Sequence, residues 1–193
     1  MKPVLLYLHG FNSSPQSYKA RLLGEALAAR GRADEYGCPD LPHDPDAAFV
    51  QLDAQVASMA GQPLVLVGSS LGGYYATWLA ERHGCRVVLL NPAVRPYELL
   101  ATYLGPQRNL YSGAEYVLTQ AHIDALRRHE VETITPARYF LITCSGDEVL
   151  DYRAGVERYD GSRRIIVPGS DHGFSDFADY VDTVLDYYDE FVR

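Results

Sequence analysis

The pentapeptide Gly68-Ser69-Ser70-Leu71-Gly72 places a serine between two glycines in the pattern G-x-S-x-G. An apolar run at 63–67 precedes it and an amphipathic segment begins at Leu71, so the serine falls at a strand-to-helix junction. A turn this sharp forces its central residue into a strained conformation, and flanking glycines let neighbouring backbone pass without a Cβ clash. We predict that Ser70 is an exposed nucleophile; a small residue in a tight turn is the alternative.

The same turn supplies a hydrogen-bond donor. Because Leu71 opens the predicted helix, its backbone N–H is one of the free donors of a helix N-terminus. This N–H can face the negative charge that develops when Ser70 attacks a carbonyl. The turn is therefore predicted to hold a nucleophile and half of an oxyanion hole.

Ser70 needs a base, because a serine hydroxyl is a weak nucleophile at neutral pH. His172 follows the last predicted strand in the short polar loop 169–173, and a surface-loop histidine is its alternative reading. The base in turn needs an acceptor on its other ring nitrogen. Asp147 stands nearest the end of the penultimate predicted strand; its rivals Glu148 and Asp151 are interpreted as a solvated charge and a helix N-cap.

A second loop, His9-Gly10-Phe11, follows the apolar run 4–8. In a parallel sheet the loops after the strand ends gather at one edge, so we expect this loop beside the Ser70 turn. Its useful group there is backbone N–H, and His9 is expected to pack or hydrogen-bond beneath the site. No spacing of His, Cys and carboxylates resembles a zinc site, so no metal is predicted. The other histidines are interpreted as surface or cap residues: His43, His83, His122 and His129.

The elements that must position these groups follow from apolar patterning. Helices with three- and four-residue periodicity separate the apolar runs, which implies a mostly parallel sheet covered on both faces. The predicted strands are 4–8, 32–38 (weak, at a sheet edge), 63–67, 86–90, 139–142 and 164–167. The predicted helices begin at Ser14-Pro15 and Asp44-Pro45 and cover about 71–83, 152–160 and 174–191.

No sheet signal appears between the fourth and fifth predicted strands. Two helical patches, about 96–103 and 114–129, predict a small helical cap at 92–137 within a single domain, 1–193. Leu100 and Tyr103 are candidates for the wall of an acyl pocket in this cap. Packing of the cap onto the sheet is the alternative role for them.

Composition excludes several classes of function. The 193 residues, 47% hydrophobic, suit one sizeable core. A net charge of −8 without a Lys/Arg cluster argues against nucleic acid. Three widely spaced cysteines without a C-x-x-C pair indicate reduced thiols and a cytoplasmic protein. No stretch approaches a membrane span, and the run 4–8 is too short for a signal peptide.

With these residues in view, the chain resembles the α/β-hydrolases, whose triad follows the order Ser, acid, His. It resembles more closely the bacterial YqiA-like esterase family, through blocks that span almost the whole length. These are LLYLHGFNSSPQSYKA at 5–20, VGSSLGGYYATWLAE at 67–81, NPAVRPYELL at 91–100, GDEVLDY at 146–152 and GSDHGF at 169–174. The resemblance implies Ser70 as nucleophile, Asp147 as acid and His172 as base, with the Phe11 and Leu71 N–H groups as oxyanion hole.

The resemblance also implies a minimal α/β-hydrolase with a six-stranded sheet in the order 2-1-3-4-5-6, because the chain starts at the His-Gly strand. It implies a serine hydrolase that cleaves small carboxylic esters or thioesters through an acyl-enzyme, without metal or organic cofactor. Two alternatives stay open. One is a small-peptide or amide hydrolase with the same triad, and the other is a non-catalytic ligand-binding protein on the same fold.

Overall fold

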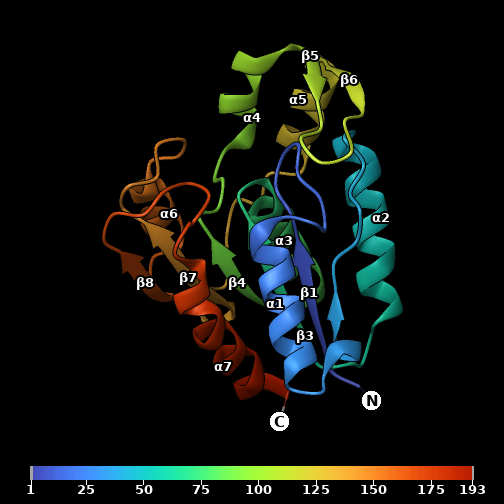
Figure 1. The fold of residues 1–193 in the computed structure, drawn as a ribbon. Helices are drawn as coiled ribbons and strands as arrows, with labels where there is room; N and C mark the ends of the chain where they lie inside the picture. The colour runs from blue at the N-terminus through green and yellow to red at the C-terminus, as the bar shows by residue number, and fades with distance from the viewer. Residues whose placement is uncertain (1, 193) are drawn as a thin grey trace.

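The structure is a computed structural model that describes residues 2–192. Within this range six strands form one sheet in the order β2-β1-β3-β4-β7-β8, with parallel pairing throughout (Figure 1). Counted along the chain within this sheet, the order is 2-1-3-4-5-6, so the prediction is confirmed. The strands are β1 (Val4–Leu8), β2 (Tyr36–Gly37), β3 (Leu64–Ser69), β4 (Arg86–Leu90), β7 (Tyr139–Cys144) and β8 (Arg163–Val167).

Helices cover both faces of the sheet, as predicted. Along β1, Leu5 and Tyr7 belong to the core on one face, and Leu6 and Leu8 belong to the core on the other. Because both faces are buried, the strands are continuous apolar runs. The first face packs on α1 (Tyr18–Ala29) and α7 (Val181–Val192), and the second on α2 (Pro45–Ser58), α3 (Leu71–His83) and α6 (Tyr152–Arg158).

Several helix ends follow local chemistry. Asp44 caps α2, where its carboxylate accepts a first-turn N–H at 2.9 Å and Pro45 begins the helix. Gly84 ends α3 in the left-handed region, with φ of 76°. Asp151 caps α6 by accepting a backbone N–H at 3.0 Å. The predicted boundaries at these three residues are confirmed.

The first helix begins later than predicted. Ser14 Oγ accepts the Gln16 N–H at 3.0 Å, and the Ser14 carbonyl accepts the Ser17 N–H at 3.1 Å. These bonds close a turn, so α1 starts only at Tyr18, with Ser17 at the N-cap position. The prediction of a start at Ser14-Pro15 is therefore wrong by one turn.

Two other elements are shorter in the structure than the ranges that the sequence predicts for them. The 3₁₀ helix η1 (Ala33–Glu35) occupies the first half of the weak strand 32–38, because the Arg32 guanidinium pairs with Glu35 at 2.7 Å. The predicted helix 174–191 begins with the 3₁₀ helix η4 (Phe177–Tyr180), because Phe174 has φ of 59° and cannot continue a helix.

The insertion between β4 and β7 is only partly helical. The predicted helix 114–129 is wrong over Glu115–Leu118, which pairs antiparallel with 105–108. Tyr116 and Leu118 are the less exposed side chains there, alternating with Glu115 and Val117, which is the period of a strand. A 3₁₀ helix, η3 (Pro136–Arg138), leads into β7. The insertion contains α4 (Pro96–Leu100), η2 (Ala101–Tyr103), β5 (Gly105–Arg108), β6 (Glu115–Leu118) and α5 (Gln120–Arg128).

This insertion lies above the carboxyl ends of the sheet strands, where α5 packs against α2 and α4 (Figure 1). Residues of the loops that follow β1, β3, β7 and β8 line one cavity together with residues of α4. Among residues 2–192, every helix is too short or too polar to cross a membrane.

Candidate active site

Ser70 lies at the junction of β3 and α3, in the turn that G-x-S-x-G predicts. Its φ of 53° and ψ of −120° fall in a sparsely populated region for a residue with a Cβ. The Ser70 N–H donates to the Leu90 carbonyl at 3.1 Å, and the Ser70 carbonyl accepts from Gly73 and Ala93 at 2.9 and 3.0 Å. The predicted strain is thus present and is held by α3 and the residues after β4.

The glycines around Ser70 are required by close backbone contacts. A Cβ on Gly72 would lie 1.9 Å from the Leu8 carbonyl oxygen, and one on Gly68 would lie 2.5 Å from the Gly72 oxygen. A Cβ on Gly10 would lie 3.2 Å from Ser70 Cβ. The loop after β1 therefore packs directly on the Ser70 turn, as predicted.

Three predicted site residues meet at this turn. His172 Nε2 lies 3.1 Å from Ser70 Oγ, and His172 Nδ1 lies 2.8 Å from Asp147 Oδ2. The three residues follow β3, β7 and β8, so neighbouring strand ends bring together positions far apart in the chain. This connectivity allows a base to accept the hydroxyl proton while a carboxylate stabilises the resulting imidazolium.

The Asp147 carboxylate is buried, with its side chain 1% exposed. Its Oδ1 accepts the backbone N–H groups of Val149 and Leu150 at 2.9 and 2.8 Å. Burial alone would raise the pKa of Asp147, but the hydrogen bonds from His172 and these two N–H groups lower it below its usual value. An ionised acceptor on Nδ1 favours the tautomer in which His172 Nε2 is free to take a proton.

The two rival carboxylates occupy other positions. Glu148 Oε2 accepts the backbone N–H of His172 at 3.0 Å, and Asp151 caps α6. Within residues 2–192, neither forms a hydrogen bond with the His172 ring. Glu148 is exposed, as predicted, but it also holds the backbone of the histidine loop.

Asn91 is a positioning residue that the sequence reasoning missed. It is buried at the end of β4, where its Nδ2 donates to the carbonyls of Asp171 and His172 at 3.1 and 3.3 Å. Its Oδ1 accepts the Cys144 N–H at 2.7 Å. A sequence signal existed: an asparagine directly after a strand tolerates the left-handed region, and Asn91 has φ of 43°.

Lys19 is a second residue that sequence reasoning missed. Its Nζ donates to the carbonyl of Gly173, directly after the histidine, at 2.7 Å. The sequence carries no signal for this contact, since a lysine in an amphipathic helix usually lies in solvent. The backbone around His172 is thus held by side chains from three separate elements.

The predicted oxyanion-hole residues lie beside Ser70. Phe11 and Leu71 line the same cavity as Ser70 and His172. Among the hydrogen bonds of residues 2–192, none uses the backbone N–H of Phe11 or Leu71. Two unused donors beside a serine hydroxyl are the arrangement that stabilises an oxyanion.

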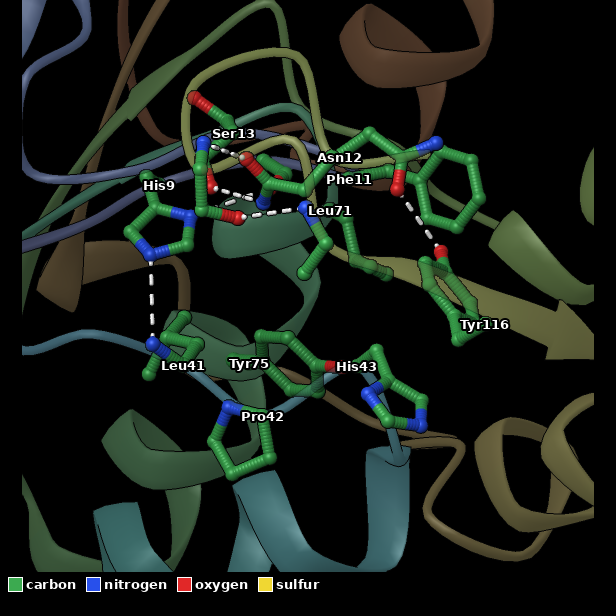
Figure 2. A pocket seen from close by; sticks show the side chains of 14 residues that line it. His9, Phe11, Asn12, Ser13, Leu41, Pro42, His43, Leu71, Tyr75 and Tyr116 are labelled. Atoms are coloured by element: carbon green, nitrogen blue, oxygen red, sulfur yellow. Dashed lines mark hydrogen bonds between the residues drawn. The ribbon is translucent and has the colours of Figure 1, made fainter. Parts of the chain in front are cut away.

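His9 directly precedes the loop that carries Phe11, and its ring points toward Leu41 (Figure 2). Its Nε2 accepts the Leu41 N–H at 3.3 Å, so Nδ1 carries the proton and donates to the Gly10 carbonyl at 3.1 Å. Burial lowers the pKa of His9, which favours the neutral ring. The prediction that His9 hydrogen-bonds beneath the site is confirmed.

A cavity beside this loop has a volume of about 200 Å³, and neither Ser70 nor His172 lines it. Figure 2 shows the side chains of its wall. Tyr116 of β6 donates from its hydroxyl to Asn12 Oδ1 at 2.8 Å, and His43 stacks on the Tyr116 ring with centroids 4.4 Å apart. The insertion is thereby tied to the loop that follows β1.

Two cavities do contain both Ser70 and His172. The first, of about 240 Å³, has mainly apolar walls that include Leu100 and Tyr103. Leu100 is also part of the core, whereas Tyr103 is 48% exposed. The second, of about 300 Å³, has Lys19 in its wall. Ser70 thus faces two cavities, and only the second has a lysine in its wall.

The cysteines are free thiols. Burial raises the pKa of Cys38 to about 12 and that of Cys85 to about 11, so both are protonated at neutral pH. No group of three or more His, Cys, Asp or Glu side chains between residues 2 and 192 is placed to hold a metal ion.

Solved structures of low sequence identity share this fold. A putative hydrolase from Agrobacterium vitis has a TM-score of 0.74 at 17% identity and covers 97% of this chain and 88% of its own. The mouse alpha/beta hydrolase domain-containing protein 10 has a TM-score of 0.71 at 15% identity and covers 97% of this chain and 91% of its own. The esterase domain of a Rhodothermus marinus protein has a TM-score of 0.71 at 17% identity and covers 100% of this chain and 90% of its own. These similarities show the α/β-hydrolase fold.

Curated relatives align over a shorter range. A UPF0227 protein of Shewanella sediminis is 27% identical over 96 residues, and the UPF0227 protein YcfP of Escherichia coli is 28% identical over 96 residues. Each alignment covers 49% of this chain and 54% or 53% of the relative, so the chain spans about half the length of the curated relatives it matches. The predicted YqiA-like resemblance is confirmed by a family match over residues 4–189. Since that match covers nearly the whole sequence, the chain belongs to the uncharacterised protein family UPF0227.

Proposed function

We propose that this protein is a serine hydrolase that cleaves small carboxylic esters or thioesters through an acyl-enzyme on Ser70. One observation carries the proposal: the hydrogen-bonded series Ser70, His172 and Asp147 stands at a strained strand-to-helix turn. Two of the similar structures are described as a hydrolase and an esterase domain, which agrees with this assignment.

In the proposed reaction Ser70 Oγ attacks the acyl carbonyl while His172 Nε2 takes its proton. The Phe11 and Leu71 N–H groups bind the oxyanion, and Asp147 stays ionised beside the imidazolium. His172 then protonates the leaving alcohol or thiol. A water molecule, deprotonated by His172, opens the acyl-enzyme and releases the acid.

The apolar cavity supports an assignment of the acyl chain. We place that chain against Leu100 and Tyr103, within the 92–137 cap of a single domain, 1–193. Transition-state stabilisation then comes from the groups around Ser70, and the cap supplies binding. Three free cysteines suit a reducing compartment, and we place the protein in the cytoplasm.

A substrate panel tests the proposal. Purified protein and its Ser70→Ala variant are assayed with acyl esters, acyl thioesters and short peptides of graded length. We expect ester or thioester turnover that falls by about 10⁴-fold or more in the variant. Faster cleavage of peptides would favour an amide hydrolase, and ligand binding without any turnover would favour a non-catalytic protein.

A further inference from the structure

The second cavity beside Ser70 has a buried lysine in its wall. This cavity, of about 300 Å³, includes Ser70, His172 and Lys19 in its wall, and no other Lys, Arg, Asp or Glu lines it. Lys19 is 9% exposed. The protein carries a net charge of −8 and has only two lysines, so a cation at this place is a specific feature of the site.

The Lys19 ammonium has few partners for a buried charge. It has three donors, and within residues 2–192 it forms one hydrogen bond, to the Gly173 carbonyl at 2.7 Å, and no ion pair within 4.0 Å. Burial lowers the pKa of Lys19 to about 8, against the opposing fields of Cys144, Asp171 and Asp147, so the group is mostly protonated at neutral pH. A buried charge is costly unless it is paired, and a negative group in the cavity would pair it.

Two further observations point to an anion at the same place. Ser17 Oγ is buried and forms no hydrogen bond of normal geometry within the described chain; its polar neighbour is the Tyr7 hydroxyl, and both residues line this cavity. Ser17 is also the N-cap of α1, a helix of 12 residues, and Tyr18 and Lys19 of its first turn line the cavity too. The first N–H groups of a helix are unpaired and attract negative charge.

We propose that the leaving group of the substrate carries an anionic substituent, a carboxylate or a phosphate, that binds Lys19 and Ser17 at the start of α1. This inference rests on the proposed function, because the acyl chain assigned to the first cavity leaves the cavity of Lys19 and Ser17 for the alcohol or thiol. His172 lines both cavities, which places the proton donor at the bond that breaks.

Matched esters test the inference. p-Carboxyphenyl butanoate and p-carbamoylphenyl butanoate have nearly the same size and differ in charge, and a p-phosphonooxyphenyl ester separates phosphate from carboxylate. The ratio of kcat/KM for the charged and neutral esters is compared between the wild type and Lys19→Met. This ratio cancels any general effect of losing the Gly173 contact, because both esters experience it equally.

We expect the charged-to-neutral ratio to fall by about tenfold or more in Lys19→Met, the usual size of a hydrogen bond to a charged group. Lys2→Met, which removes the other lysine at an exposed position, should leave the ratio unchanged. Ser17→Ala removes no capping bond and should lower the ratio by a smaller factor, which provides a second variant if Lys19→Met fails to fold.

An unchanged ratio in both Lys19→Met and Ser17→Ala would overturn the inference. A Lys19-dependent preference seen only with p-nitrophenyl hydrogen adipate over p-nitrophenyl methyl adipate would also overturn it, because that charge lies on the acyl side. If no ester is turned over, the proposed function has failed, and calorimetry then compares p-hydroxybenzoate with p-hydroxybenzamide. Equal affinity of the wild type for the two would overturn the anion site itself.

Discussion

At the scale of single residues, Asp147 differs from its neighbouring carboxylates by what its two oxygens contact. One oxygen faces the His172 ring and the other accepts two backbone N–H groups, so the carboxylate is fixed in one orientation. Asp147→Asn replaces the charged acceptor with an amide that favours the wrong imidazole tautomer. We expect kcat for ester hydrolysis to fall by about 10⁴-fold with circular dichroism unchanged.

Glu148→Gln and Asp151→Asn are the matched controls for this substitution. Glu148→Gln retains an oxygen that accepts the His172 backbone N–H, and Asp151→Asn retains one that accepts the Arg153 N–H. We therefore expect kcat to change by less than about tenfold in either variant. A larger loss in Asp151→Asn than in Asp147→Asn would show that the acid is assigned to the wrong residue.

Lys19 makes a separate prediction about stability and pH. Its pKa is about 8 in the folded protein and 10.5 as a free side chain, so between these values the unfolded chain binds more protons. Stability contributed by this group therefore rises with pH across that window. The wild type and Lys19→Met differ in their free energy of unfolding. Between pH 8 and 10.5 this difference should move in favour of the wild type by on the order of 3 kcal/mol.

Urea unfolding of the wild type, Lys19→Met and Lys2→Met measures this difference. Tyrosines and cysteines also titrate in that range. Because all three proteins contain the same tyrosines and cysteines, their contributions cancel when the free energies of unfolding are subtracted. The Lys2→Met difference should stay flat with pH, because Lys2 is half-exposed and ion-paired with Asp34. A flat Lys19→Met difference would contradict the burial of the ammonium.

Residue types explain which parts of the site the sequence predicts. Ser70, His172 and Asp147 each follow an apolar run, which predicts a strand. The sequence therefore indicates both what these side chains can do and that they lie after strand ends. Lys19 and Asn91 act through hydrogen bonds to carbonyls 154 and 80 residues away, respectively. Such contacts depend on how α1 and β4 pack around the last loop, and local patterns do not encode them.

At the scale of elements, the buried strands were predictable and the hairpin of the cap was not. Strands β1, β3, β4 and β7 are apolar on both faces, which gives continuous runs. β5, with the sequence GPQR, has no apolar alternation, and its partner β6 is only four residues long. Their hairpin is instead held from outside, by the Tyr116 hydroxyl on Asn12 and the Asn109 side chain on the Ser13 carbonyl at 2.9 Å.

The cap element carries a prediction about substrate selection. Tyr103 lines the apolar cavity and is 48% exposed, so Tyr103→Ala enlarges that wall at little cost to the core. A group that binds ground and transition states equally alters KM more than kcat. We expect KM to change and the preferred acyl chain to lengthen across a series of p-nitrophenyl esters, with kcat within about threefold of wild type.

Leu104→Ala is the matched control, because Leu104 is similarly exposed at 46% but does not line the cavity. It should leave the chain-length profile unchanged. A uniform fall in kcat across all chain lengths in Tyr103→Ala, with KM constant, would mean that Tyr103 supports the reacting groups instead of the acyl chain.

At the scale of the whole molecule, the topology makes a site from residues that are distant in the sequence. Every strand of the main sheet runs in the same direction, so the ends of β3, β7 and β8 lie at one edge of the sheet (Figure 1). The last loop is fastened there by Glu148, Asn91 and Lys19, which come from three different elements. The backbone of the histidine loop is thus fixed by three side chains. In the reaction that we propose, this pre-ordering of His172 lowers the cost of reaching the transition state.

Covalent labelling tests the central claim most directly. The protein is treated with a fluorophosphonate, which phosphonylates a serine only where a base and an oxyanion hole act on it, and is then measured by intact mass and peptide mapping. We predict one adduct on Ser70, lost in Ser70→Ala and strongly slowed in Asp147→Asn. Full labelling of Ser70→Ala, or an adduct on another residue of the wild type, would contradict the account.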